Sequence, residues 1–288
     1  MIIGQIIGGL GNQMFQYAFY KYLSISKECD LKLDLFLFDN YELHNGYELE
    51  NAFGVIEDIA TKDEIKKFKT SCPLFFRIEN KLFDRNFMFG TKHYKENKFY
   101  IDNNIFDKSL DDFYVEGYFQ TYMYIQELDQ NLFQFQTKLS ETETELLQGN
   151  VVSIHIRGGD YITSKKDSAL FGNICTKKYY KNAIEHIKSF TENPKFLIFT
   201  NDKAYAKQLL IGEDFEIVDW NGGKDSFRDM FLMSQCKHNI IANSSFSWWG
   251  AWLNNNTSKI VVTPSKWFND KSINQNEIIP KNWIRVGL

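Results

Sequence analysis

The chain opens with a hydrophobic run that gives way to a helical pattern. Residues 2–7 (IIGQII) are mostly apolar, glycines follow at once, and residues 12–27 place apolar side chains at helical spacing. Residues 31–38 (LKLDLFLF) form an alternating pattern that is typical of a strand. This order of strand, glycine-rich loop, helix and strand predicts the opening of a Rossmann-like unit.

The second half of the chain shows a clearer alternation of strands and helices. Its short apolar runs and short connections predict a parallel sheet with helices on both faces. Residues 40–110 have weak periodicity and are predicted only as mixed helix and loop, whereas residues 136–150 are predicted to form a linker helix. The predicted strands are 151–157, 196–200, 215–220, 239–243 and 259–264, and the predicted helices are 176–190, 202–210, 226–236 and one from Ser245.

The length and composition suit two modest domains. The chain has 288 residues, of which 43 % are hydrophobic, 24 % charged and 16 % aromatic, enough for a packed core in each half. We predict an α/β protein with two Rossmann-like halves that face a central cleft. The predicted domains are residues 1–148 and 149–288, with the option that about the last 20 residues pack back on the first half.

The composition also narrows the class of function and the compartment. A net charge of −4 gives no excess of positive charge that could bind nucleic acid, so no nucleic-acid partner is expected. The apolar N-terminus lacks a basic region and breaks into glycines, which argues against a signal peptide or membrane anchor. The four cysteines are far apart in the sequence and have no metal-ligand spacing. We expect a bacterial cytoplasmic protein; a peripheral position at the inner membrane is compatible with this.

A glycine-rich loop follows the first predicted strand. Gly9 and Gly11 would let backbone amides approach an anion at a helix N-terminus, and Asn12 and Gln13 add side-chain amides. A dinucleotide fingerprint would require a glycine at Met14. The loop therefore indicates either a phosphate cradle or a tight turn that binds no ligand.

The segment HIRGGDY, residues 155–161, lies at the end of a predicted strand, where open α/β sheets bind ligands. Alternation places His155 and Arg157 on the same side of the strand. A guanidinium there suits a phosphate leaving group, because it stays charged and presents a fork of donors. The alternative is a structural ion pair between Arg157 and Asp160, with His155 as a core residue.

A third candidate segment is NIIANSSFSWWGAWL, residues 239–253. Asn243, Ser244 and Ser245 follow a predicted strand and are expected to cap a helix, which gives a second anion-binding helix terminus. Upstream, Asp229 could accept hydrogen bonds from a guanine edge or could be a solvated charge, and spacing alone does not decide between them. The tryptophans of this segment are predicted to be core packing rather than a sugar platform: Trp248, Trp249 and Trp252.

Several familiar catalytic signatures are missing from the sequence. No two aspartates are two residues apart, so the Asp-x-Asp pair of metal-dependent sugar transferases is absent, and there is no P-loop, HExxH or GxSxG motif. We therefore expect no metal and no cofactor. A leaving diphosphate would be stabilised by Arg157, backbone amides and helix dipoles.

Taken in order, GGLGNQMFQYAF, HIRGGDY and SQCKHNIIANSSFSWWGAWL closely resemble the bacterial α-1,2-fucosyltransferases of glycosyltransferase family eleven. The shorter segments EGYFQ, FTND and TPSKWFND are similar to that family too. The resemblance implies a GT-B-type fold, GDP-L-fucose as donor, galactose or a related sugar of an oligosaccharide or lipid-linked glycan as acceptor, inversion at the anomeric carbon and no metal. It also implies a role in surface polysaccharide synthesis, such as O-antigen or capsule.

The resemblance also assigns residue roles. Arg157 would contact the β-phosphate and the glycosidic oxygen, with His155 beside it on the donor, and Asp229 would meet the guanine. Asn12 would reach the fucose or a phosphate. Four residues at the end of the predicted strand 239–243 and just after it are expected to bind the donor: Asn243, Ser244, Ser245 and Phe246. The last three of them would surround the diphosphate.

One position departs from the family pattern, which usually reads His-x-Arg-Arg-Gly-Asp-Tyr. Gly158 stands in place of the second arginine, so restoring an arginine there is expected to strengthen donor binding. Asp160 is the nearest candidate for a general base that would deprotonate the acceptor hydroxyl. The alternatives are a fucosyltransferase of another linkage such as α-1,3, an NAD-dependent sugar-nucleotide reductase, or a catalytically weak nucleotide-sugar-binding protein.

Overall fold

The computed structural model describes residues 1–40, 44–69, 92–97, 99, 101, 103–107, 112–210 and 212–287, without the side chains of residues 40, 160 and 162. These residues form two compact units. The first unit comprises residues 1–134 and 272–277, and the second comprises residues 135–271 and 278–288. Each unit is built around its own parallel sheet.

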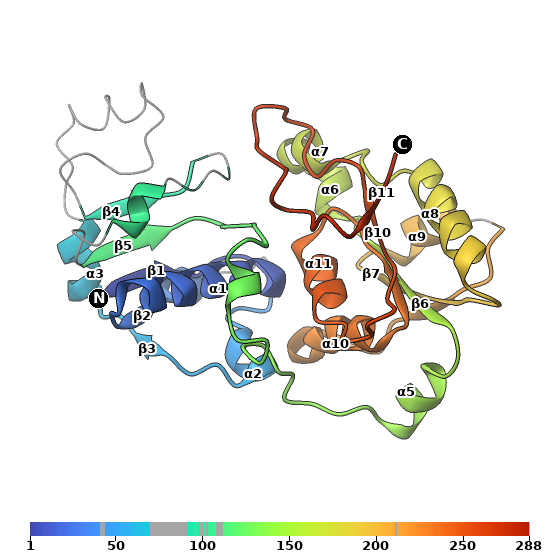
Figure 1. Cartoon of the computed structure of the whole chain (residues 1–288), viewed down its shortest axis with the longest axis horizontal. Helices are drawn as coiled ribbons and strands as arrows, with labels where there is room; N and C mark the ends of the chain where they lie inside the picture. The colour runs from blue at the N-terminus through green and yellow to red at the C-terminus, as the bar shows by residue number, and fades with distance from the viewer. Residues whose placement is uncertain are drawn as a thin grey trace. The chain divides into compact units, whose positions relative to one another are not determined.

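The first unit contains a five-stranded sheet in the order β3-β2-β1-β5-β4, in which all the paired strands are parallel (Figure 1). Much of the predicted mixed segment 40–110 lies outside the described residues, but its described parts include two short strands, β3 and β4. The described elements of this unit are β1 (Ile2–Gln5), α1 (Leu10–Lys27), β2 (Leu31–Asp34), η1 (Phe36–Asn40), α2 (Leu49–Phe53), β3 (Asp58–Ile59), α3 (Lys62–Lys69), β4 (His93–Lys95), η2 (Asn103–Phe106), β5 (Phe113–Glu116) and η3 (Ile125–Glu127).

Helix α1 packs closely against β1 because that strand offers a glycine at the contact. The ring of Tyr20 lies so near Gly4 that a Cβ atom at position 4 would be 2.2 Å from Cδ2 of the ring. The Tyr20 hydroxyl donates a 2.7 Å hydrogen bond to the carbonyl of Gln5, and the ring is fully buried. The opposite face of the sheet is covered by α3, whose Ile65 packs with Ile3.

The second predicted strand is shorter than its alternating sequence suggests. β2 ends at Asp34, and the backbone amide of Phe36 donates a 3.1 Å hydrogen bond to the side chain of that aspartate. The chain then turns into the short 3-10 helix η1. A local side-chain bond to the backbone therefore replaces the end of the predicted strand.

The second unit contains a six-stranded sheet in the order β11-β10-β9-β6-β7-β8, again with parallel pairs. This confirms the predicted parallel sheet and the alternation of strands and helices. The described elements are α5 (Glu141–Leu146), β6 (Val151–Ile156), α6 (Asp160–Thr163), α7 (Lys165–Phe171), α8 (Lys177–Phe190), β7 (Lys195–Thr200), α9 (Lys203–Leu209), β8 (Glu216–Val218), η4 (Gly223–Asp225), α10 (Phe227–Gln235), β9 (His238–Ile240), α11 (Ser245–Trp252), β10 (Val261–Pro264) and β11 (Ile284–Val286).

Helices cover both faces of this second sheet (Figure 1). Val152 and Ile154 of β6 pack under α8 and α9, whereas Val151 faces the side of α10, where Leu232 lies. Trp248 and Trp249 are fully buried, so the predicted core role of these two rings is confirmed, and Trp252 is half-buried.

The division between the units lies before the predicted linker helix rather than after it. α5 covers only part of the predicted span 136–150, and Ser140 and Glu143 form a capping box at its start. Glu143 is buried and forms an ion pair with Arg228 of α10, at 2.6 Å. Phe135 also contacts the ring of Phe231. These contacts attach the segment to the second unit, so the predicted boundary at 148 falls inside that unit.

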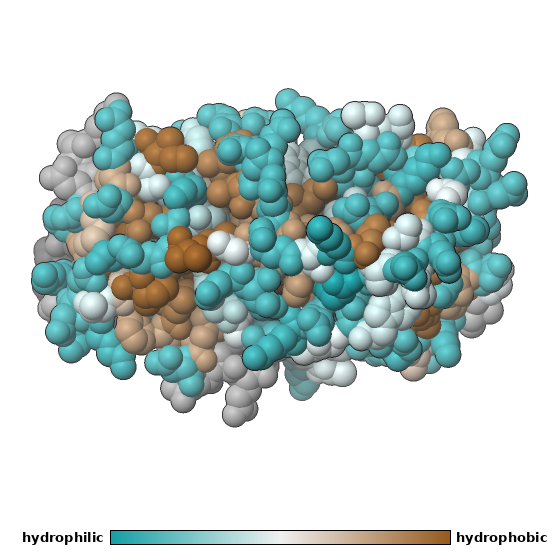
Figure 2. All heavy atoms as spheres, turned by 90° about the horizontal axis from the view of Figure 1, so that it is seen from below, coloured by the Kyte–Doolittle hydropathy of each residue, from teal (hydrophilic) through white to brown (hydrophobic). Residues whose placement is uncertain are grey.

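Hydrophilic residues predominate on the face drawn in Figure 2, and hydrophobic residues reach it in patches between them. Within the described ranges, no helix combines the length and the hydrophobicity that crossing a bilayer requires.

Candidate functional site

The strand order of the second sheet defines where its loops diverge. The connections from β6 lead through β7 to β8 on one side, whereas β9, β10 and β11 lie on the other side. β6 and β9 are neighbours, so the loops that follow them leave the same sheet edge in opposite directions. Open α/β sheets bind ligands at such a switch point. Residues 155–159 and 241–245, both predicted from the sequence, are brought together there.

His155 is at the end of β6 and presents an unused nitrogen. Its side chain is 5 % exposed, and Nδ1 has no hydrogen-bond partner among the described residues. Burial, and to a smaller extent the positive charge of Arg157, lowers the pKa of His155 to about 3. The ring lies 5.9 Å from that of Phe246. The imidazole is therefore neutral near pH 7, and its buried nitrogen is available to a ligand.

Arg157 lies against an aromatic stack that fixes its direction. The guanidinium carbon is 5.5 Å from the centre of the Tyr161 ring, which stacks on Phe171 at 4.8 Å. The Tyr161 hydroxyl donates a 3.2 Å hydrogen bond to the backbone carbonyl of Asn243. Tyr161 thus links the loop after β6 to the loop after β9 and supports the arginine by a cation–π contact.

Gly158 occupies a position that has no room for a side chain. A Cβ atom there would lie 2.7 Å from Cβ of Asp202 and 3.3 Å from the ring of Tyr205. The Gly158 amide donates a 2.8 Å hydrogen bond to the side chain of Asn201, and Asp202 caps α9. An arginine at 158 would therefore require the loop or α9 to shift, because the chain packs against α9 where that side chain would begin.

The loop after β9 places a helix N-terminus at the switch point. Ser244 is the N-cap of α11 and is buried, but its side chain makes no capping hydrogen bond. The amides of Ser245, Phe246 and Ser247 are in the first turn, where no carbonyl of the helix can accept from them. The predicted side-chain cap is therefore wrong for Ser244. The N-terminus of α11 is still a place that favours an anion, because of the helix dipole.

Asn243 has a different role from the serines. Its side-chain nitrogen donates to the carbonyls of Phe171 and Trp267, both at 3.1 Å, and its oxygen accepts from Cys175. The residue is 2 % exposed. These contacts fix the loops around the switch point, so Asn243 acts in the structure as a positioning residue.

Asp229 is on the first turn of α10 and is half-buried. The side-chain Nδ2 of Asn221 donates a 2.8 Å hydrogen bond to the Asp229 carboxylate. Burial raises the pKa of Asp229 to about 6, against the opposing effect of this hydrogen bond. The carboxylate is therefore mostly ionised at pH 7 and becomes protonated in mild acid.

The first sheet has a switch point of its own, between β1 and β5. The predicted glycine loop follows β1, and the residue that needs a left-handed backbone is Gly8, at φ 87°. Gly9 is the N-cap of α1, and Gly11 is buried in its first turn. Gly9 and Gly11 were predicted as supporting residues of the site, whereas Gly8 was predicted only as part of the loop.

The side chain of Gln13 bonds the backbone of this loop and is not free to donate a hydrogen bond to a ligand, contrary to the expectation from the sequence. The side chain is fully buried, and Nε2 donates to the carbonyls of Gly8 and Gly46, both at 2.8 Å. Its oxygen accepts from the amide of Glu48 at 2.9 Å. Gln13 therefore joins two loops, as a supporting residue.

Asn12 is held by a residue from the other loop of the switch point. Gln120 Nε2 donates a 2.9 Å hydrogen bond to Asn12 Oδ1, while Gln120 Oε1 is buried and has no partner in the described part of the chain. Glu96 fixes the corner before Gln120 by accepting from the amides of Tyr118 and Phe119, at 2.6 and 3.1 Å. Gln120 and Glu96 were not predicted as site residues.

Two further predicted features have a limited place in the structure. Asp160 begins α6, but its side chain lies outside the described set, so the predicted general base has no geometry here. In the ranges that the structure describes, no three His, Cys, Asp or Glu side chains are grouped to hold a metal ion.

Comparison with known proteins gives a consistent result along the whole chain. The family described as "Glycosyl transferase family 11" matches residues 2–287. An α-1,2-colitosyltransferase of Escherichia coli is 31 % identical and aligns over 99 % of both chains. The O-antigen biosynthesis glycosyltransferase WbnK, also of Escherichia coli, is 35 % identical over 97 % of this chain and 98 % of its own.

Solved structures show the same fold at low sequence identity. A mutant of FUT1 from Arabidopsis thaliana, in complex with GDP, has a TM-score of 0.54 at 12 % identity, covering 97 % of this chain and 72 % of its own. The fucosyltransferase NodZ from Bradyrhizobium has a TM-score of 0.51 at 13 % identity, covering 88 % and 91 %. These similarities confirm the predicted GT-B-type α/β fold.

Proposed function

This chain belongs to glycosyltransferase family 11, and from that premise we propose that it transfers L-fucose from GDP-L-fucose to the 2-hydroxyl of a galactose or related residue in a glycan. The observation that carries the proposal is the switch point of the second sheet. There a stacked arginine, a neutral buried histidine and a helix N-terminus are linked through Tyr161 and Asn243.

The diphosphate of the donor is assigned to two electropositive features of this edge. We assign the β-phosphate and the bridging oxygen to Arg157, whose fork of donors matches phosphate geometry. The first-turn amides of α11, from Ser245 and Phe246, supply the second feature, with Ser244 beside them. A phosphate here would meet positive potential without a bound metal.

The nucleoside is assigned to the polar groups that surround these phosphate donors. The Asp229 carboxylate would accept from the N1–H and amino groups of guanine, because both are donors and face the same way. His155 Nδ1 is buried and lacks a protein partner in the described part of the chain, so a ligand hydroxyl is the group that would satisfy it. Asn243 holds these loops in place.

The chemistry then follows from charge development. As the bond between the anomeric carbon and the bridging oxygen breaks, negative charge grows on the departing GDP, and Arg157 stabilises it more in the transition state than in the ground state. The acceptor oxygen forms the new bond from the opposite face of the sugar, which inverts the anomeric centre. Its proton passes to a base, for which Asp160 remains our candidate.

The hydroxyl-bearing sugar that reacts is assigned to the first unit. The loop of Gly8 and Gly9 at the start of α1, supported by Gln13, holds Asn12 at the switch point of that sheet. We propose that Asn12 binds a sugar hydroxyl of the reacting pair and that the unpartnered oxygen of Gln120 accepts from another. Two amides at one edge suit a neutral polyhydroxylated substrate.

The relative WbnK of Escherichia coli is an O-antigen biosynthesis glycosyltransferase, which supports our proposal that the acceptor is a glycan of surface polysaccharide synthesis. The Escherichia coli relatives also supply a second candidate donor. One relative is a colitosyltransferase, and colitose is fucose without its 3-hydroxyl, so GDP-colitose is the alternative nucleotide sugar.

The test is an acceptor screen read by mass spectrometry, with GDP-fucose and GDP-colitose in parallel. The expected product is a galactoside that carries fucose on its 2-hydroxyl, located by NMR. Fucose on a 3-hydroxyl would favour the α-1,3 alternative, and turnover of GDP-colitose alone would change the donor. GDP binding with no transfer to any acceptor would favour a nucleotide-sugar-binding protein, and NADH oxidation would favour a reductase.

A further inference from the structure

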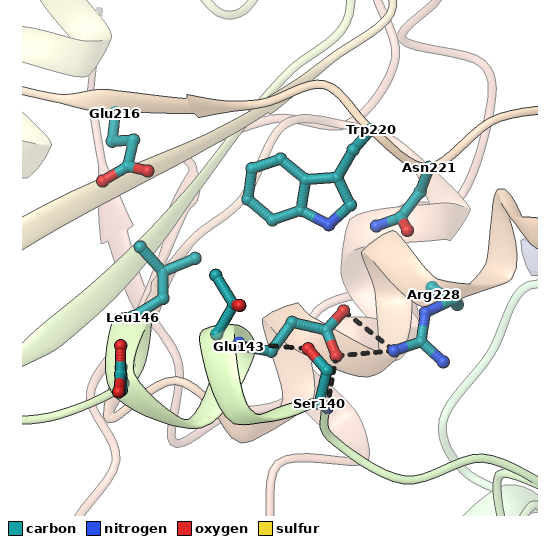
Figure 3. A pocket seen from close by; sticks show the side chains of 9 residues that line it. Ser140, Glu143, Leu146, Glu216, Trp220, Asn221 and Arg228 are labelled. Carbon is teal, nitrogen blue, oxygen red and sulfur yellow. Dashed lines mark hydrogen bonds and ion pairs between the residues drawn. The ribbon is translucent and has the colours of Figure 1, made fainter.

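A pocket of about 580 Å³ lies in the second unit, between α5 and the segment from β8 to α10 (Figure 3). Its volume is in the range of small-molecule sites, which is about 300–1,000 Å³. Trp220 and Asn221 line it from the loop after β8, and Leu146 lines it from α5. None of the residues assigned to the donor lines it, although Asn221 also bonds Asp229. The pocket therefore borders the residue assigned to guanine but does not include it.

The walls of the pocket are fixed by buried contacts. The guanidinium of Arg228 bonds both carboxylate oxygens of Glu143, at 2.8 and 2.6 Å, and also donates to Thr137. Ser140 caps α5 in front of this ion pair. A site whose walls are already ordered pays little to bind a ligand.

Among the residues that line the pocket, Trp220 is unusual because its large side chain is 49 % exposed. The tryptophans at 248, 249, 267 and 283 are all buried. In Figure 3 the indole of Trp220 is on one side of the pocket, while Leu146 and Glu143 are on the other side. An indole that lines a pocket and is half exposed offers an apolar face with a polar N–H edge, which suits a ligand that has both apolar and hydroxyl-bearing surfaces.

The charge of the pocket restricts the class of that ligand. Glu145 and Glu216 line it, are exposed and form no ion pair within the described residues, while the positive charge of Arg228 is balanced by Glu143. Unbalanced carboxylates repel phosphates and acidic sugars but accept hydrogen bonds from hydroxyl groups. A cation cage would surround its ligand with several aromatic rings, and this pocket is lined by one.

We propose that the Trp220 pocket binds a neutral hexose of the acceptor glycan. This hexose is a different residue of the glycan from the one whose hydroxyl reacts. The C–H face of a pyranose would cover the indole, and its hydroxyls would bond Glu216, Glu145 and Asn221. This rests on the proposed function only in taking the ligand to be an acceptor glycan. It predicts that long acceptors bind better than short ones.

The test is a binding measurement that needs no turnover. Saturation-transfer NMR with lacto-N-tetraose, a neutral tetrasaccharide, would be recorded in the presence of saturating GDP, and its affinity measured by titration. Trp220→Ala should weaken the affinity about tenfold or more, as truncation of a central aromatic contact does. Phe190→Ala, which removes a ring that is 68 % exposed on α8 outside the pocket, should leave it unchanged. Glu216→Gln should weaken it less than Trp220→Ala.

The outcomes separate this proposal from the others. Unchanged affinity in Trp220→Ala, or no binding of the tetrasaccharide to the wild type, would overturn it. A tenfold loss of GDP affinity in Trp220→Ala would also overturn it and assign the pocket to the nucleotide. If fucosyl transfer fails while tetrasaccharide binding still depends on Trp220, the glycan site stands and the proposed function falls. With active enzyme, Trp220→Ala should raise KM for the tetrasaccharide and leave kcat and KM for lactose unchanged.

Discussion

The side-chain amide of Gln120 holds the side-chain oxygen of Asn12 at 2.9 Å, across 108 residues of sequence. The two residues follow neighbouring strands, β5 and β1, so the bond joins the two loops of one switch point. Gln120 keeps a buried oxygen without a partner in the described part of the chain. An amide that positions one residue and leaves an acceptor open is suited to recognise a hydroxyl group.

Gln120→Leu should therefore raise KM for the acceptor, by about tenfold if one good hydrogen bond and the position of Asn12 are lost together. GDP affinity, measured by calorimetry, should stay within a factor of two of wild type, or about 0.4 kcal/mol. Gln13→Leu is the matched control, because its amide bonds only the backbone of the protein. It should lower the free energy of unfolding by about 1–3 kcal/mol. An acceptor KM that is insensitive to Gln120→Leu would remove Gln120 from the site.

Gly158→Ala tests the close packing of the HIRGGDY loop on α9. The new methyl group would lie 2.7 Å from Cβ of Asp202, so we expect a loss of about 1–3 kcal/mol in the free energy of unfolding. Gly158→Arg should destabilise at least as much and should not lower KM for the donor. The control is Gly222→Ala, because a Cβ there meets nothing within 4 Å. Equal stability of the variants at 158 and 222 in urea unfolding would show that the loop can move away from α9.

Arg157→Lys separates chemistry from binding. A lysine keeps the charge but not the fork of donors, so kcat should fall by about 100-fold or more, as it does when one preorganised donor is removed. GDP should still bind within about tenfold, because the first-turn amides of α11 remain. Arg285→Lys is the control, since Arg285 bonds a carbonyl near the chain end and is assigned no role in the site. Turnover close to wild type in Arg157→Lys would favour the structural ion pair with Asp160.

The affinity for GDP should depend on pH through Asp229. Burial raises the pKa of its carboxyl to about 6. Guanine binds the ionised form, so affinity is full well above pH 6 and falls as the pH drops through 6. From pH 7.5 to pH 5 the loss from this group should be about tenfold. His155 does not interfere, because its pKa of about 3 keeps it neutral over this range.

Asp229→Asn is the control that separates the protonation of Asp229 from the protonation of GDP. It should bind GDP more weakly at pH 7.5 and should lack the part of the pH dependence that belongs to the carboxylate. Calorimetry at three pH values on both proteins measures the difference. Parallel pH curves for wild type and Asp229→Asn would exclude Asp229 from the guanine contact.

Much of the second unit could be predicted from the sequence because its signals are local. The strand of His155 is a run of apolar residues between turn signals, and the segment at Asn243 joins a strand to a helix within a few residues. Period and length decide such elements without knowledge of their neighbours. The same holds for α1 and for the core role of Trp248.

The residues that were missed depend on contacts between distant segments. Gln120 matters because β5 lies beside β1, and Glu96 because β4 lies beside β5, which no local pattern reveals. Tyr161 was noted only as part of the HIRGGDY motif, although its ring supports the guanidinium of Arg157. The crowding at Gly158 was missed for the same reason, since the obstructing residue, Asp202, follows a different strand.

The predicted boundary at 148 differs from the division after residue 134 for a related reason. A polar segment between two patterned halves is typical of a linker, and only the long-range ion pair of Glu143 with Arg228 shows that it belongs to the second unit. β4 has only three residues, His93–Lys95, and its sequence shows no strand pattern. The edge of the first sheet could therefore not be predicted.

The contact between Gly4 and Tyr20 also bears on how this chain can diverge. Any side chain at position 4 would overlap the ring, so a lineage cannot gain one there while it keeps the tyrosine. The order of events is constrained: the ring at 20 must shrink first, and each intermediate then carries a cavity in the core. Positions 4 and 20 should therefore covary among homologues, and each glycine-to-larger change at 4 should be accompanied by a smaller residue at 20.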